Sequence, residues 1–271
     1  MRNSIKISIM VALVLIAIIA INVLIFKGNF GVESGTDSAP EVKTNYKIPD
    51  VIRIATEGSY PPFNGKNTDG TLYGFDVELG NALCAEMQRK CEFIEQVWEG
   101  IIPGLKEEKY DAIMAAMSIT PERALEINFS DPYFDNSLIV VGHKGSAVNT
   151  VEEIKNKTVG VQKETVAAKF MSDNYGRDWD SKLFDTQDQV YENFIAGRID
   201  YFICDFALVP DWIKDHQDAV IVGKIQIEDH FGIAVRKEDK ALLTNLNAAL
   251  KNLRSNGRYD EIYATYFSAV Q

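Results

Sequence analysis

Apolar and polar residues alternate with two different periods along the chain after residue 47. Residues 51–56 form a short apolar run typical of a buried strand, and a polar turn follows it. From residue 75 to 87 the apolar residues recur at helical spacing, and they are Phe75, Val77, Leu79, Leu83 and Met87. A short helix and then a strand at 111–117 come next. This order predicts an α/β unit.

The second half of the chain repeats the order. A strand enters a helix at 158–170, and a helix enters a strand at 190–209. The segments 106–117 and 195–206 have the same layout, since each contains a helix end, an aspartate and an apolar strand. We therefore expect two similar α/β lobes rather than a tandem solenoid.

The N-terminus has a third pattern. Arg2 and Lys6 precede 20 residues without a charge, from 7 to 26. A secretory apolar region usually has ~7–15 residues, whereas ~20 residues are needed to span a bilayer. We expect an uncleaved signal-anchor at 1–26 with the rest of the chain on the exported side. A long cleaved signal peptide is the alternative, and a buried core helix is a third. Residues 27–47 lack periodicity and are expected to form a flexible tether.

Composition narrows the class of partner. The chain has 271 residues, of which 46% are hydrophobic and 25% charged, as in globular proteins. Its formal net charge of −11 argues against nucleic acid and anionic membrane surfaces. The three histidines are scattered and no CxxC motif is present, so neither a metal nor a cofactor is expected.

The cysteines agree with export. Cys84 and Cys91 lie seven positions apart, around the end of the predicted helix. In an exported protein such a pair is a candidate disulfide that would add about 2–3 kcal/mol, and two free thiols are the alternative. Cys204 lies in an apolar run and is expected to be buried in a strand.

The strongest chemical signal is the position of Arg123. Thr120 is a good helix N-cap and Pro121 a favoured first helical residue, so Arg123 falls in the first turn. A helix N-terminus is already positive, which makes a cation there unfavourable unless an anion joins it. We expect that anion to be a ligand carboxylate, held by the guanidinium fork. Pairing with Glu126 or Asp131 is the alternative.

Other polar or aromatic residues follow the predicted strands. Because ligands of open α/β sheets bind beyond the carboxyl ends of strands, residues at four such ends are expected to converge on one cleft. They are Glu57, Ser59 and Tyr60, then Ser118 and Arg123, then Gln162 and Thr165, and finally Asp205. Amides near Ser118 and Val166 would bind an anion, and Asp205 would hold an ammonium. Together these groups describe a site for an α-amino acid. Taken singly, Tyr60 and Trp98 would be ordinary core or surface aromatics, Glu57 a solvated turn residue and Asp205 a cap.

Four segments resemble a known family. They are IRIATEGSYPPFN, GFDVELGNALCAEM, IIPGLKEEKYDAIMAAMSITPERALEINFSDPYFDN and GIAVRKED. The chain from about residue 48 to 267 is similar to the periplasmic polar-amino-acid-binding proteins of ABC uptake systems, solute-binding protein family 3. The likeness is closest to arginine-binding and lysine/arginine/ornithine-binding members.

The resemblance implies a fold and a set of roles. The fold is α/β and two-lobed, the type II periplasmic-binding-protein fold, with two hinge crossovers; lobe I comprises 48–136 and 230–271, and lobe II comprises 137–229. By the resemblance, Arg123 binds the ligand carboxylate with the amides of Ser118 and Val166. Asp205 and the Ser118 hydroxyl bind the ammonium, and Tyr60 and Trp98 sandwich the side chain. The resemblance places Glu57 at the distal cationic group, and Cys84 with Cys91 matches the subgroup's disulfide. The ligand-binding set is Glu57, Tyr60, Trp98, Ala116, Ser118, Arg123, Gln162, Val166 and Asp205.

The chain also departs from the family pattern. Ala115 and Ala116 replace frequent serine or glycine, and Val166 replaces a frequent threonine. Glu164 stands in a turn that usually contains glycine. These differences bear on which ligand binds.

The expected function follows from this resemblance. We expect a monomeric periplasmic receptor that captures a basic amino acid, with L-arginine first, and delivers it to an ABC permease. It would not be an enzyme. One alternative is a cyclohexadienyl or arogenate dehydratase on the same fold, with Glu57 or Glu164 as general acid. The other is an amino-acid-sensing receptor domain.

Overall fold

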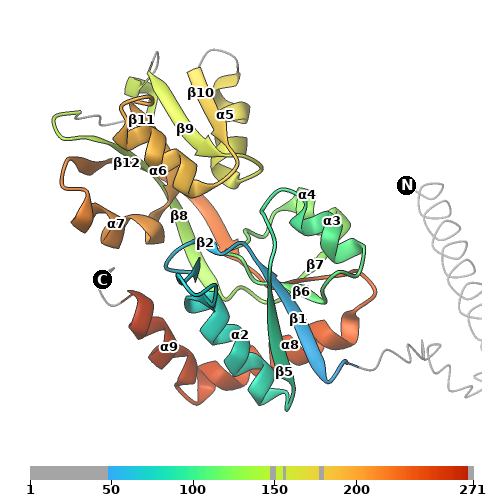
Figure 1. The fold of residues 1–271 in the computed structure, drawn as a ribbon. Helices are drawn as coiled ribbons and strands as arrows, with labels where there is room; N and C mark the ends of the chain where they lie inside the picture. Colours follow the sequence, from blue (N-terminus) through green and yellow to red (C-terminus); the bar gives the residue numbers. More distant parts are fainter. Residues whose placement is uncertain (1–47, 147–150, 155–156, 177–179, 268–271) are drawn as a thin grey trace, which may run out of the picture. The chain divides into compact units, whose positions relative to one another are not determined.

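Two sheets of five strands each organise the part of the chain that the structure describes. The computed structural model describes residues 48–146, 151–154, 157–176 and 180–267 (Figure 1). The predicted signal-anchor at 1–26 and the tether at 27–47 lie outside these residues. Within the described ranges, no helix has the length and apolar character needed to cross a bilayer.

The first sheet combines the beginning and the end of the described chain. Its strand order is β5 (Lys90–Glu95), β1 (Val51–Thr56), β6 (Ala112–Ile113), β13 (Ala234–Val235) and β7 (Asn128–Phe129). β1 is parallel to β5 and β6, whereas β13 is antiparallel to β6 and β7. Its helices are α2 (Phe75–Glu86), α3 (Ile101–Lys106), α4 (Pro121–Glu126), α8 (Lys240–Ser255) and α9 (Arg258–Phe267).

Both faces of this sheet are covered. The apolar stripe of α2 packs with α8 and α9 on one face, where Ile52 and Leu79 are fully buried. Ile101 and Leu105 of α3 pack on the other face. A small antiparallel sheet of β2 (Ser59–Tyr60), β3 (Asn64–Lys66) and β4 (Leu72–Tyr73) follows β1.

The second sheet comes from the middle of the chain. Its order is β10 (Asp180–Phe184), β9 (Thr158–Gln162), β11 (Tyr201–Asp205), β8 (Phe134–His143) and β12 (Ala219–Phe231). β9 runs parallel to β10 and β11, and β8 is antiparallel to β11 and β12. Its helical segments are η1 (Val151–Ile154), α5 (Val166–Tyr175), α6 (Gln187–Ile195), η3 (Phe206–Leu208) and α7 (Val209–Asp215).

The two-lobed α/β prediction is confirmed. We call the first sheet with its helices the first lobe, and the second sheet with its helices the second lobe. Two connections join them, from β7 into β8 and from β12 into β13 (Figure 1). The isolated bridge between Ser118 and Phe231 lies where these segments meet. The predicted lobe boundaries at 136/137 and 229/230 fall within β8 and β12 and stay a proposal.

One predicted element is shorter than expected. The apolar run at 111–117 forms a strand only over β6, because Ala116 adopts a left-handed backbone with φ of 47°. A left-handed residue ends an extended run, since strand residues need negative φ.

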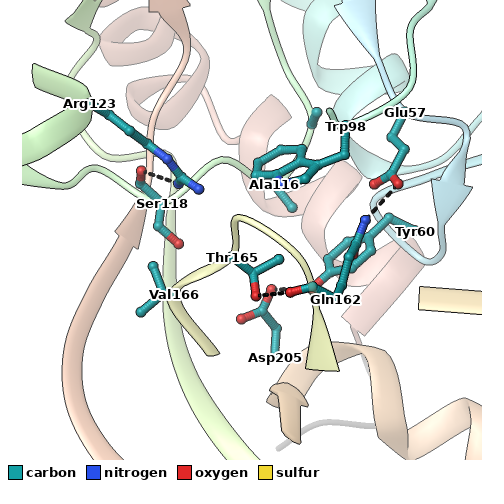
Figure 2. A pocket seen from close by; sticks show the side chains of 11 residues that line it. Glu57, Tyr60, Trp98, Ala116, Ser118, Arg123, Gln162, Thr165, Val166 and Asp205 are labelled. Carbon is teal, nitrogen blue, oxygen red and sulfur yellow. Dashed lines mark hydrogen bonds between the residues drawn. The ribbon is translucent and has the colours of Figure 1, made fainter. Parts of the chain in front are cut away.

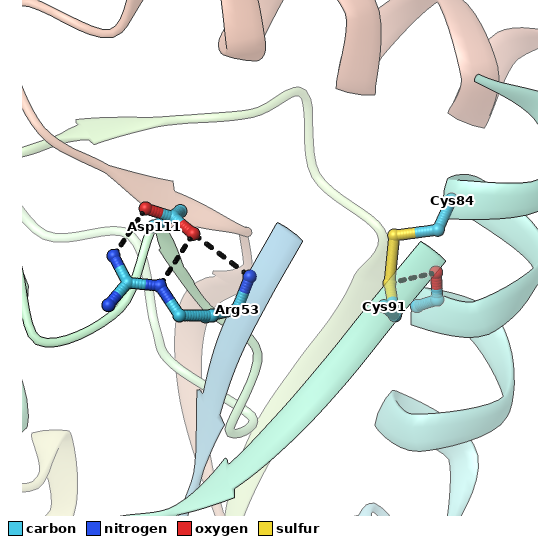
Figure 3. The surroundings of a disulfide bond; sticks show 5 residues. Arg53, Cys84, Cys91 and Asp111 are labelled. Atoms are coloured by element: carbon cyan, nitrogen blue, oxygen red, sulfur yellow. Dashed lines mark hydrogen bonds and ion pairs between the residues drawn. A yellow bond between two sulfur atoms is a disulfide. The ribbon is translucent and has the colours of Figure 1, made fainter. Parts of the chain in front are cut away.

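A disulfide joins Cys84 of α2 to Cys91 of β5 (Figure 3). It closes the segment between a helix and the edge strand that follows it. The same region contains Arg53 of β1, whose guanidinium and backbone amide donate to the Asp111 carboxylate next to β6. Cys204 is buried and free, as the sequence predicts.

Candidate functional site

A cavity between the two sheets is lined by the predicted residues (Figure 2). Its empty space is about 310 Å³, part of it continuous with solvent. Both lobes contribute to it at the ends of their strands. The lining residues are Glu57, Tyr60, Trp98, Ala115, Ala116, Ser118, Arg123, Gln162, Thr165, Val166 and Asp205. All nine residues of the predicted ligand-binding set are among them; their roles stay proposals.

Arg123 projects into one end of this cavity. The predicted helix start is confirmed: Thr120 caps α4 by accepting from the Arg123 amide, and Pro121 is the first helical residue. The guanidinium donates Nη1 to the Ser118 carbonyl and Nη2 to the Glu164 carbonyl, each at 2.8 Å. Of the five N–H donors of an arginine, these two bonds leave three for other partners.

Arg123 forms no ion pair within the described part of the chain. The alternative pairing with Glu126 is wrong, because Glu126 pairs with Lys106 at 2.7 Å. Burial lowers the pKa of Arg123, and the negative charges of Asp229 and Asp205 act against that shift. The Trp98 ring stacks 5.1 Å from the guanidinium carbon, which adds a cation–π contact.

Two residues with available backbone amides, Ser118 and Val166, line the cavity near Arg123 (Figure 2). Ile119 donates to the His230 carbonyl and Gly232 to the Met117 carbonyl, so Ser118 and Phe231 form a non-hydrogen-bonded pair. The Ser118 amide therefore has no role in this ladder. Val166 is the first residue of α5, and its amide has no acceptor within the helix. The two amides and the free Arg123 donors make this end of the cavity suited to an anion.

Asp205 forms the opposite wall, at the end of β11. Its two oxygens accept from the Tyr60 hydroxyl at 2.5 Å and from Asn136 Nδ2 at 2.6 Å. Burial and then the charge of Asp229 raise the pKa of Asp205 to about 7, although the two hydrogen bonds and Arg123 oppose the rise. An added cation would favour the charged carboxylate, which is the condition for an ammonium site.

Glu57 lies in the turn after β1 and is 6% exposed. Its Oε1 accepts from Gln162 Nε2 at 2.7 Å, a bond between the lobes. Burial raises the pKa of Glu57 to about 7, more than the bonds from Gln162 and Ser59 lower it. Glu57 is therefore a second buried acid in the cavity, near the α6 residue Asp188.

Residues that the sequence analysis did not predict hold the lining residues in place. Asp76 in α2 is fully buried and accepts from the Ala116 amide at 2.9 Å, the Tyr133 hydroxyl at 2.8 Å and Asn64 at 3.1 Å. It thereby holds Ala116 in its left-handed conformation beside the cavity. Burial raises the pKa of Asp76 to about 7. The sequence feature that could have identified Asp76 is its position among apolar residues at helical spacing, since an aspartate that faces the core needs hydrogen-bond partners.

Asn136 and Asp229 were also missed by the sequence reasoning. Asn136 Nδ2 donates to both Asp205 and Asp229, and the Ser118 hydroxyl donates to Asp229 at 3.1 Å. These two residues lie on β8 and β12, beside the connections between the lobes. Neither follows a parallel strand, so the rule that located the other residues did not apply to them. No cluster of metal-ligating side chains occurs among the described residues.

Comparison with known proteins identifies the family. The family model of bacterial extracellular solute-binding proteins, family 3, matches residues 52–269. The chain belongs to this family. It is a family of non-enzymatic binding proteins, and its fold is the type II periplasmic-binding-protein fold.

Individual relatives within family 3 agree. A protein of Escherichia coli (strain K12) named as an ABC transporter arginine-binding protein is 34% identical over 221 residues, 80% of this chain and 90% of its own. A histidine-binding periplasmic protein of the same strain is 36% identical over 230 residues, 81% of this chain and 88% of its own. The structure of an ancestral arginine-binding protein bound to arginine superposes with a TM-score of 0.76 at 34% identity. It covers 82% of this chain and 100% of that one.

Proposed function

We propose that this protein captures a basic L-amino acid, with L-arginine preferred, in the periplasm and delivers it to an ABC permease. One observation carries the proposal. A single cavity contains the Arg123 guanidinium, which pairs with no carboxylate of the described residues, and two buried carboxylates, Asp205 and Glu57, with raised pKa values. Arginine carries the complementary set of charges: a carboxylate, an ammonium and a cationic side-chain tip.

The carboxylate would bind at the Arg123 end. Three guanidinium donors and the Ser118 and Val166 amides are available there. An Arg–carboxylate pair is often bidentate and is stronger than a neutral hydrogen bond. The ligand would also balance a half-buried cation, because Arg123 has no carboxylate of its own in the described structure.

The ammonium would bind between Asp205 and Ser118. Asp205 supplies a buried negative charge, and Ser118 supplies hydroxyl lone pairs, since its proton is donated to Asp229. An ammonium has three donors and no acceptor, so it needs such a set of acceptors. Neutral or anionic groups at this position would leave the carboxylates unbalanced.

Glu57 would select the side chain. Its carboxylate lies in the same cavity as Asp205 and is buried, so a cationic tip would gain from an interaction only weakly screened by water. Tyr60 and Trp98 line the cavity and would cover the aliphatic part of the side chain. The arginine-binding and histidine-binding relatives support a basic ligand but do not distinguish between the two.

Lobe closure would signal occupancy. Three contacts between the lobes are formed by cavity residues: Glu57 with Gln162, Tyr60 with Asp205, and Arg123 with the Glu164 carbonyl. A ligand that binds the same groups from both sides would favour the closed arrangement over an open one. A permease that recognises the closed form would then receive loaded protein. We expect the receptor to act as a monomer, held at the membrane by a signal-anchor at 1–26.

Calorimetry tests this function directly. The full chain, in mild detergent, is unfolded and refolded to remove carried-over ligand and is titrated with the common L-amino acids. Submicromolar binding of arginine, with weaker lysine and histidine and no glutamine, is the expected result. A folded protein that binds none of them would overturn the proposal, and cyclohexadienyl acids would then be the next ligands to test.

A further inference from the structure

A further buried carboxylate, that of Asp229, lies next to Asp205 and shares the Asn136 side chain with it. Asp229 of β12 is 5% exposed, and its Oδ2 accepts both from the Ser118 hydroxyl at 3.1 Å and from Asn136 Nδ2 at 2.7 Å. It does not line the cavity itself. Nothing in the expected amino-acid site requires it, and a buried carboxylate without a cation is costly.

Asp229 and Asp205 are close to each other. Each has an oxygen bonded to Asn136 Nδ2, at 2.7 Å and 2.6 Å, so these two oxygens are at most 5.3 Å apart. An amide nitrogen has only two protons, and both are then used between the two acids. Two carboxylates at this distance in a buried place repel each other, and a shared cation would relieve the repulsion.

Asp229 also determines how Ser118 can bind. A hydroxyl has one proton and two lone pairs, and the Ser118 proton is donated to Asp229. The lone pairs of Ser118 therefore accept rather than donate on the cavity side. This selects a ligand group that carries protons and works against a second acceptor.

We propose that Asp229 is a positioning residue for the ammonium subsite, where it orients the Ser118 hydroxyl and adds a second negative charge to Asp205. The inference rests on the proposed function, since it names the ligand group that this end of the site takes. In the occupied site the ligand carboxylate would neutralise Arg123, and the ammonium would lie beside the two carboxylates and relieve their repulsion. The titratable groups near Asp205 are Tyr60, Arg123, Tyr191 and Asp229 from other elements and Cys204 from its own strand.

Ligand pairs separate this role from a purely structural one. Asp229→Asn keeps the shape and an acceptor oxygen but removes the charge. It should weaken the binding of L-arginine about tenfold or more. It should weaken the binding of des-amino arginine, measured by displacement, less than about twofold. Glu228→Gln is the matched control, because it removes a neighbouring charge whose side chain is 92% exposed. It should change neither affinity by more than about twofold. Equal losses for both ligands in Asp229→Asn would overturn the proposal.

A second measurement needs no ligand. Carboxyl NMR titration of Asp205 in the full chain should give a lower pKa in Asp229→Asn than in the parent, because a nearby negative charge has been removed. Glu228→Gln should leave the Asp205 pKa unchanged. If Asp229→Asn also leaves it unchanged, the proposal fails whatever ligand the protein binds. A parent protein that binds no amino acid would defeat the proposed function instead, and the titration would still decide on Asp229.

A second variant tests the proposal if the first one does not fold. If Asp229→Asn does not fold, Ser118→Ala removes the oriented hydroxyl and should also weaken L-arginine more than des-amino arginine. An equal effect of Ser118→Ala on the two ligands would count against the proposal.

Discussion

Arg123 and Arg236 are two arginines of the first lobe with different surroundings; Arg123 is half-buried and Arg236 is buried. Both donate to two backbone carbonyls: Arg123 to those of Ser118 and Glu164, and Arg236 to those of Leu105 and Tyr110. Arg236 also has two carboxylates, Asp239 at 2.6 Å and Asp111 at 3.6 Å. Arg123 has none in the described structure.

The acids near the two arginines differ in the same way. Burial alone would raise the pKa of Asp111, but the bonds from Arg53 and the charge of Arg236 outweigh it, and the pKa is lowered. Burial raises the pKa of Asp205 to about 7. The hydrogen bonds that Asp205 accepts and the charge of Arg123 lower that pKa only in part. Charges around Arg236 balance within the protein, whereas charges around Arg123 do not. The imbalance marks the region where a charged ligand is needed.

The largest expected effect is on stability, at Arg236. Arg236→Met would remove the guanidinium that pairs with the buried Asp239 carboxylate, and we expect it to lower the free energy of unfolding by about 3–5 kcal/mol. Urea unfolding of the full chain in detergent measures this. Arg123→Met should cost at most about 1 kcal/mol, because it strands no carboxylate. Similar losses of unfolding free energy in the two variants would mean that Arg123, like Arg236, balances charge within the protein.

Ligand binding should respond in the opposite order. We expect Arg123→Met to weaken L-arginine at least about hundredfold, because a charge-assisted bidentate pair is lost. Arg123→Lys keeps the charge without the fork and should recover only part of the affinity. Calorimetry measures both. Unchanged affinity in Arg123→Met would mean that the guanidinium is structural, like that of Arg236.

Glu57 is expected to select the side chain of the ligand. Glu57→Gln should weaken L-arginine by about tenfold and spare neutral amino acids, because only a cationic tip uses the charge. Titration of both ligand classes against the variant and the parent measures the difference. Equal losses for the two classes would remove Glu57 as the selector.

A smaller effect is expected from pH. Burial raises the pKa of Glu57 and of Asp205 to about 7, and a bound cation would lower both pKa values by favouring the charged forms. Binding near pH 7 therefore releases protons, and the arginine affinity should fall about threefold between pH 8 and pH 7. Calorimetry in buffers of different ionisation enthalpy counts the protons. Affinity that rises on acidification has the wrong sign for this mechanism.

Much of the fold could be predicted because its signals are local. The strand at 51–56, the helix with Phe75 and Leu79 buried, and the Thr120–Pro121 helix start are each specified by neighbours in sequence. The disulfide between Cys84 and Cys91 joins residues close in the chain. Ala116 differs, since its left-handed backbone depends on a hydrogen bond from its amide to the Asp76 carboxylate, which is 40 residues away.

The cavity was predictable where strand ends supply the residues. Parallel strands bring their carboxyl ends to one edge, so Arg123, Gln162 and Asp205 could be grouped without coordinates. Asn136 and Asp229 could not, because they act across separations of 69 and 93 residues from long antiparallel strands. Only the way β8 and β12 pass between the lobes brings them to Asp205.

Arg123 pairs with no carboxylate of the described residues, and we propose that the ligand provides one. The most direct test compares L-arginine with L-argininamide, in which an uncharged amide replaces the α-carboxylate, by calorimetry on the parent protein and on Arg123→Met. We predict that the amide binds at least about hundredfold more weakly to the parent and that the difference nearly vanishes in the variant. Equal binding of the two ligands by the parent protein would mean that Arg123 does not bind the ligand carboxylate.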